Sequence, residues 1–163
     1  MWNLFVDTDS LYMEIKRQYG QHARVDYIDL PLNIARTLPE LDHFDEKVAL
    51  VLRHGDTLQP FWNSLERWGY RVIPTDKGMQ QITVGSQVNE LASRCDGLVI
   101  VAAGCWLRVL AQQVLDKGNK VVLATPPHND HTNPEIDAAT MPLEYRRVVI
   151  DHRWLWKRRQ EVR

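Results

Sequence analysis

The sequence predicts an α/β protein, a three-layer α/β/α sandwich with a mainly parallel central sheet. Strand-like and helix-like segments alternate along the chain, which is typical of this fold class. The segment 97–102, GLVIVA, has no polar residue, so as a strand it must be covered on both faces. Right-handed crossovers between parallel strands then place helices on the two faces of the sheet.

The first half of the chain contains apolar runs that are separated by glycine, proline and charged residues. In the helix-like runs the apolar residues recur at helical spacing, as Phe61, Leu65 and Trp68 do at i, i+4 and i+7. The expected elements are a strand at 3–6, a helix at 11–19, a helix at 30–38, a strand at 47–53, a helix at 58–68 and a strand at 70–74.

The second half continues this alternation around the central strand. The segment 75–85, TDKGMQQITVG, has little periodicity and predicts a loop. The segment 125–140 is rich in proline and asparagine and predicts a surface loop with a short helical turn. The other expected elements are a helix at 86–94, the strand at 97–102, a helix at 107–115, a strand at 120–124 and a strand at 147–150.

Length and composition favour one globular domain over residues 1–150. The chain has 163 residues, of which 44% are hydrophobic and 25% charged, as in ordinary globular proteins. No apolar run approaches the roughly 20 residues of a membrane span. The beginning of the chain lacks the charged region and cleavage site of a signal peptide. We therefore expect a cytoplasmic protein without a membrane partner.

Residues 151–163 form a predicted basic tail that contains two tryptophans. Five cations and one acid lie between His152 and Arg163. Basic charge attracts phosphates and tryptophan faces can stack on bases, so the tail is a candidate RNA contact. Docking to a protein partner, closure of the core by the tryptophans and simple surface charge are the alternatives. The candidate contact residues are Trp154, Trp156, Arg158 and Arg159.

The stretch VDTDSLY, residues 6–12, places two carboxylates at the end of the first predicted strand. Ligands in open α/β sheets bind at the carboxyl ends of strands, so Asp7 and Asp9 are candidate metal ligands. The alternative is an Asx or Ser cap that opens a helix at Leu11. Both interpretations can hold together if Ser10 caps the helix while Asp7 points into a crevice.

Four segments together resemble the NYN family, a branch of the PIN-like metal-dependent ribonucleases that includes LabA-like proteins. The resemblance covers about 110 residues, from Leu4 to Leu123. The four segments are FVDTDSLY at 5–12, RVDYIDL at 24–30, FWNSLERWGYRV at 61–72 and VNELASRCDGLVIV at 88–101. The resemblance implies a PIN-like sandwich and, in active members, an Mg²⁺ or Mn²⁺ site built from three or four carboxylates.

Most of the carboxylates that the family pattern would place in this chain are absent from it. Asp7 matches the first aspartate of the family, but Ser10 stands where the family has asparagine. Thr83 and Asn89 stand where the resemblance places acids. After the central strand the family reads Ser-Gly-Asp-x-Asp-Phe, whereas this chain has AAGCWL, which places Trp106 in or beside the crevice. A hard cation needs several oxygen ligands, so we expect weak metal binding at Asp7 and no resident cofactor.

Three further positions are candidate binding residues. His54 and Asp56 follow the strand at 47–53 and end at the same sheet edge, although Asp56 could simply cap a helix. Lys77 lies in the predicted loop and could contact phosphate. The cluster HNDH at 128–131 has two histidines, but it lacks nearby third and fourth ligands, so a solvated loop is favoured over a zinc site.

The sequence is compatible with two functions. The first is a catalytically degenerate NYN/PIN-like domain that binds RNA or protein as a regulatory or structural subunit, with self-association also open. The second is a ribonuclease that uses Mg²⁺ or Mn²⁺ in a rearranged site. That site would be built from Asp7 and Asp9 with help from Asp56, Asp76 or Asn89.

Overall fold

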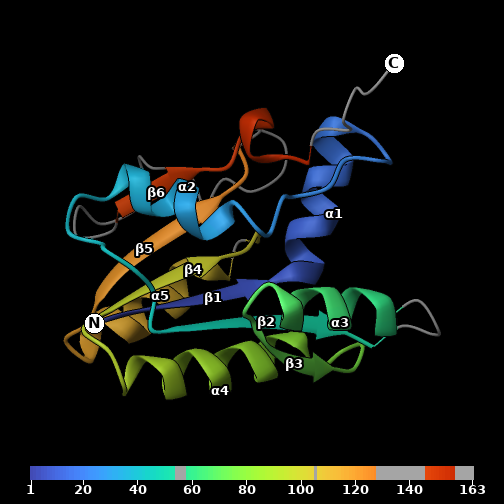
Figure 1. Ribbon diagram of the computed structural model, residues 1–163. Helices are drawn as coiled ribbons and strands as arrows, with labels where there is room; N and C mark the ends of the chain where they lie inside the picture. The colour runs from blue at the N-terminus through green and yellow to red at the C-terminus, as the bar shows by residue number, and fades with distance from the viewer. Residues whose placement is uncertain (54–57, 105, 128–145, 157–163) are drawn as a thin grey trace.

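The computed structural model describes residues 1–53, 58–104, 106–127 and 146–156 (Figure 1). The six described strands form one sheet in the order β3-β2-β1-β4-β5-β6, and every neighbouring pair is parallel. This confirms the predicted fold class. The strands are β1 (Trp2–Asp7), β2 (Glu46–Leu52), β3 (Arg71–Thr75), β4 (Gly97–Val101), β5 (Lys120–Thr125) and β6 (Arg146–Val149).

Helices cover both faces of the sheet. One buried cluster contains residues of the first three helices, and the other contains residues of the last two. None of the described helices has the length and apolar character that a membrane span requires. The helices are α1 (Thr8–Tyr19), α2 (Leu30–Thr37) and α3 (Leu58–Arg67) on one face, and α4 (Gln80–Ala92) and α5 (Leu107–Asp116) on the other.

The apolar strand β4 lies inside the sheet between β1 and β5. All five of its residues are buried. Leu98 and Ile100 belong to the cluster under α4 and α5, whereas Val99 and Val101 belong to the cluster under α1, α2 and α3. The alternation of side chains along a strand explains this division. The expected covering of this strand on both faces is therefore confirmed.

The order of the strands reverses between β1 and β4. The chain moves from β1 outward to β3, crosses the opposite face through α4, and continues from β4 to β6 (Figure 1). In open parallel sheets such a switch point leaves a crevice at the carboxyl ends of the two strands. Asp7 ends β1, and the segment 102–104 follows β4, so this edge is where a binding site is expected.

Helix α4 begins at Gln80, so the prediction of a loop through residue 85 is wrong. Val84, Val88 and Leu91 are buried at i, i+4 and i+7, and they hold the helix on the sheet. The hydroxyl of Thr83 bonds to the carbonyl of Met79 at 3.0 Å, within the first turn. Of these three residues only Val84 lies before residue 86. One buried position is too few to show helical periodicity, so the sequence of this stretch did not predict a helix.

The chain after β6 packs against the domain. Trp154, in the short 3-10 helix η3 (His152–Trp154), is 7% exposed and belongs to the core cluster beneath α1, α2 and α3. Its carbonyl accepts a hydrogen bond from Asp26 N at 3.1 Å, and Leu155 forms a bridge with Val25. The expected stacking role of Trp154 in a separate tail is therefore corrected, because its ring fills the core.

The two tryptophans should differ in their contribution to stability. Trp154→Ala removes a buried ring, and we expect it to lower the free energy of unfolding by roughly 3–5 kcal/mol. Trp156 is 53% exposed, so Trp156→Ala should change stability by no more than about 0.5 kcal/mol. Urea denaturation of both variants checks this. Equal effects would contradict the placement of Trp154 in the core.

Candidate functional site

Asp7 is the N-cap of α1. Its Oδ1 accepts hydrogen bonds from Asp9 N at 3.2 Å and from Ser10 N at 3.3 Å. The side chain of Asp7 satisfies two amide groups that lack partners inside the helix. Of the two expected kinds of cap, the structure has the Asx cap, whereas Ser10 lies inside the helix. The expected helix start at Leu11 is corrected, because the chain passes directly from β1 into a helix that begins at Thr8.

Ser10 closes the crevice at the switch point. Its Oγ accepts a hydrogen bond from Ala103 N at 3.1 Å and donates to the carbonyl of Asp7 at 3.4 Å. The hydroxyl thus joins the start of α1 to the segment that follows β4. The position at which the resemblance expected an asparagine serves here as a structural bridge.

Burial raises the pKa of the Asp7 carboxyl above its ordinary value. The side chain is 2% exposed, and loss of hydration disfavours the charged form. The hydrogen bonds from Ser10 oppose this effect, while the negative charge of Asp9 adds to it. Burial also raises the pKa of Tyr27, with a smaller contribution from Asp7. The environment of Asp7 therefore favours the neutral carboxyl more than water does.

Of the other proposed helpers, the two that the structure describes, Asn89 and Asp76, have partners other than Asp7. Asn89 lies in the second half of α4, where its Oδ1 accepts a hydrogen bond from Lys117 Nζ at 2.8 Å. Lys117 ends α5 just before the amino end of β5, so Asn89 faces the opposite edge of the sheet and its expected place in the site is wrong. Asp76 is exposed and lies 3.6 Å from Arg53.

Trp106 lies beside the segment that follows β4. It precedes α5 and packs, partly buried, against the cluster under α4 and α5. Gly104 has a φ of +141°, and a Cβ added to it would lie 2.4 Å from Nε1 of Trp106. The indole therefore occupies the space next to Gly104 and leaves no room for the aspartate that the family pattern has in this segment.

A cavity of about 580 Å³ opens next to Asp9 on the α1 face of the sheet. It is bounded by α1, the segment 23–27, the end of β2 and α3. Tyr27 and Phe61 lie in its wall with ring centres 5.7 Å apart. The lining residues are Thr8, Asp9, Tyr12, Met13, Ile15, Lys16, Ala23, Arg24, Val25, Tyr27, Val51, Leu52 and Phe61.

Two cations flank an exposed aromatic ring at the rim of this cavity. Tyr12 is 37% exposed, with Lys16 Nζ 5.7 Å and Arg24 Cζ 5.6 Å from its ring centre. These distances are within the range of cation–π contacts. Arg24 also donates to the carbonyls of Gln21 and Ala23. Within the described ranges, neither cation forms an ion pair with a carboxylate.

The sequence interpretation missed this rim. Asp9, Tyr12 and Lys16 lie at i, i+3 and i+7, which places them on one face of α1. That spacing was available in the sequence as a signal. Arg24 comes from a separate segment, and only the folded structure brings it to Tyr12.

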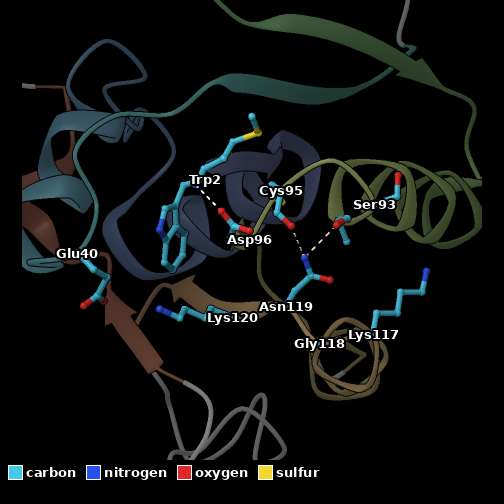
Figure 2. A pocket seen from close by; sticks show the side chains of 11 residues that line it. Trp2, Glu40, Ser93, Cys95, Asp96, Lys117, Gly118, Asn119 and Lys120 are labelled. Atoms are coloured by element: carbon cyan, nitrogen blue, oxygen red, sulfur yellow. Dashed lines mark hydrogen bonds and ion pairs between the residues drawn. The ribbon is translucent and has the colours of Figure 1, made fainter.

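A second cavity of about 720 Å³ lies at the opposite, amino edge of the sheet (Figure 2). Its polar groups maintain the fold. Asn119 Nδ2 donates to the carbonyls of Ala92 at 2.9 Å and Cys95 at 2.7 Å, and the amino group of Met1 lies 2.7 Å from Asp96. We therefore place the candidate site at the carboxyl edge, where, among the described residues, the side chains of Asp9 and Lys16 form no hydrogen bond that maintains the fold.

The remaining predicted positions divide between exposed and undescribed residues. Lys77 is exposed after β3 and lines none of the cavities described above. Trp156 is exposed, and its amide donates to the carbonyl of Arg24. Outside the described residues lie His54, Asp56, the HNDH cluster at 128–131, Arg158 and Arg159.

The described ranges contain no group of three or more histidine, cysteine or acidic side chains that could hold a metal ion. Asp7 and Asp9 are close enough for the charge of Asp9 to affect the pKa of Asp7. Two carboxylates, one of them buried and capping a helix, are a poor donor set for Mg²⁺ or Mn²⁺. Weak metal binding at Asp7 stays a prediction.

Two substitutions of Asp7 should distinguish the contribution of its capping hydrogen bonds to stability from the effect of its negative charge. Asparagine keeps a capping oxygen, so Asp7→Asn should match or exceed the wild-type stability at pH 7. Asp7→Ala should lose about 1 kcal/mol. The raised pKa means that ionisation destabilises the fold as pH rises above the unfolded value of 3.8. Any gain in Asp7→Asn should therefore vanish below that pH. Urea denaturation at pH 7 and pH 3 checks this, and equal losses in both variants would contradict the cap.

The sequence matches no protein-family model and no curated protein. The structure is similar to the crystal structure of a protein of unknown function from Vibrio parahaemolyticus RIMD 2210633. The TM-score is 0.74, the alignment covers 95% of each chain, and the sequence identity is 16%. The chain thus shares its parallel α/β fold with a solved protein, and at this identity the likeness concerns the fold alone.

Proposed function

We propose that this chain is a catalytically degenerate PIN-like domain, similar to the NYN family, that binds single-stranded RNA as a regulatory or structural subunit. The observation that carries the proposal is the rim of the carboxyl-edge cavity. There, Tyr12 lies between Lys16 and Arg24, two cations without an ion pair in the described part of the chain.

The surroundings of Asp7 do not suit a catalytic metal ion. A catalytic Mg²⁺ or Mn²⁺ requires several oxygen ligands, with ionised carboxylates among them. Asp7 uses one oxygen to cap α1, and burial disfavours its charge. Ser10 is engaged with Ala103, and Trp106 stands where the family has an acidic segment. These contacts support a fold that keeps the position of the metal site without its chemistry.

The rim of the cavity has the groups that bind single-stranded RNA. Unpaired cations attract phosphates by releasing counterions, and exposed aromatic rings stack on unpaired bases. Bases in a duplex are stacked in the helix, whereas those of a single strand can turn into a protein cavity. The cavity beside Asp9 provides such a space. These features support single-stranded RNA as the partner class.

Fluorescence anisotropy with a labelled single-stranded RNA at several salt concentrations tests the proposal. Lys16→Gln and Arg24→Gln should each lower the slope of log K against log salt by about 0.7, because one phosphate contact is lost. Tyr12→Ala should cost roughly 1–3 kcal/mol of binding with a nearly unchanged slope. Lys120→Gln is the matched control, since Lys120 is exposed at the amino edge of the sheet and lies outside the cavity. Absence of RNA binding, or an equal effect of Lys120→Gln, would contradict the proposal.

The rival function is a metal-dependent ribonuclease with a rearranged site. One observation favours it: Asp9 lines the cavity, and its charge acts on Asp7. Incubation of the same labelled RNA with Mn²⁺ separates the two functions. Cleavage that is lost in both Asp7→Asn and Asp9→Asn would establish the rival, whereas bound and intact RNA supports the degenerate domain.

A further inference from the structure

We infer that the cavity beside α1 binds one nucleotide of the strand and prefers bases with an exocyclic amino group over uracil. The base would enter the cavity towards Asp9, and its phosphate would lie at Lys16 and Arg24. The inference rests on the proposed function and names the unit that this site recognises.

The spacing along α1 fits one nucleotide. Asp9 and Lys16 are seven residues apart on one helix, which corresponds to about 10 Å at the helical rise. Tyr12 lies between them on the same face, and all three line the cavity. This separation is comparable to the length of a nucleotide from the base edge to the phosphate. A cavity of about 580 Å³ also lies within the range of small-ligand sites.

The wall of the cavity suits a flat aromatic ring. Tyr27 and Phe61 lie in the wall, and the rest of it is largely apolar. The hydroxyl of Tyr70 donates to the carbonyl of Tyr27 at 2.8 Å, and the rings of these two residues meet edge to face. These contacts fix Tyr27 before any ligand arrives, and a fixed wall costs less entropy on binding.

Asp9 supplies the selectivity. It is a carboxylate that lines the cavity, and within the described residues its side chain accepts no hydrogen bond. A carboxylate only accepts, so it pairs with the amino groups of adenine, cytosine or guanine. Uracil offers one N–H between two carbonyl oxygens, and these oxygens would repel the carboxylate. Cytosine and uracil have the same ring size, so their comparison separates this effect from stacking.

The phosphate end is fixed by the rim cations. Lys16 and Arg24 lie on opposite segments, and both approach the ring of Tyr12. They leave their charge unpaired among the described residues. A phosphate at the rim would gain a charge-assisted hydrogen bond from either cation. A phosphorylated nucleoside should therefore bind more tightly than the free nucleoside.

Isothermal titration calorimetry with the full chain and the probes CMP, UMP, AMP and adenosine tests the inference. CMP should bind about tenfold more tightly than UMP, as expected for one hydrogen bond to a charged group. AMP should bind more tightly than adenosine. Asp9→Asn should remove most of the preference for CMP, because an amide both donates and accepts. Lys16→Gln should reduce the advantage of AMP over adenosine.

Asp29→Asn is the matched control, because Asp29 is exposed before α2 and lies outside this cavity. The melting temperature of each variant verifies its fold. Equal affinity for CMP and UMP, or loss of the preference in Asp29→Asn, would overturn the inference. If the labelled RNA binds but no mononucleotide binds, the inference fails and the proposed function stands. If the labelled RNA does not bind, the proposed function fails.

Discussion

The carboxylate of Asp7 connects the sheet, the first helix and the binding edge. Asp7 is the last residue of β1, which pairs with β2 on one side and β4 on the other. Its carboxylate accepts hydrogen bonds from two amide groups in the first turn of α1. Because a buried helix end needs a partner for its amides, this side chain sets where α1 begins. The direction of α1 in turn fixes which of its residues face the cavity.

The same constraint limits the chemistry of the edge. A carboxylate that caps a helix in a buried position has one oxygen engaged and a raised pKa. The hydrogen bond between Ser10 and Ala103 draws the start of α1 against the segment after β4. What remains accessible lies along α1 from its first turn to its last, where Asp9, Tyr12 and Lys16 line the cavity. These contacts support the proposal of a binding surface at this edge rather than a metal centre.

The sequence predicted the fold well, because buried strands such as GLVIVA carry a strong apolar signal that tertiary contacts do not alter. It failed at the start of α4, where Val84 is the first buried residue after a polar stretch. It also left the α1 cap open between Asx and Ser, since both Asp and Ser favour caps and only the backbone path decides between them. Trp154 looked like part of a tail because its packing partners are far away in sequence.

The candidate site was less predictable for the same reason. The position of Asp7 at the end of β1 followed from the pattern, but its burial did not. Tyr12 and Lys16 share a helix face, and their spacing in the sequence indicates it. Arg24 lies between α1 and α2, and Phe61 lies in α3, so only the folded chain brings these two residues to the cavity. Distances between such segments depend on the whole fold.

We propose that Asp7 has a structural role and does not hold a metal. Calorimetric titration of the full chain with Mn²⁺, alongside Asp7→Asn, tests this most directly. We predict no saturable binding at micromolar Mn²⁺ in either protein. Burial disfavours the charge of Asp7, one of its oxygens caps α1, and the described residues bring no group of three metal-ligating side chains together. Binding at micromolar Mn²⁺ in the wild type that disappears in Asp7→Asn would contradict the account.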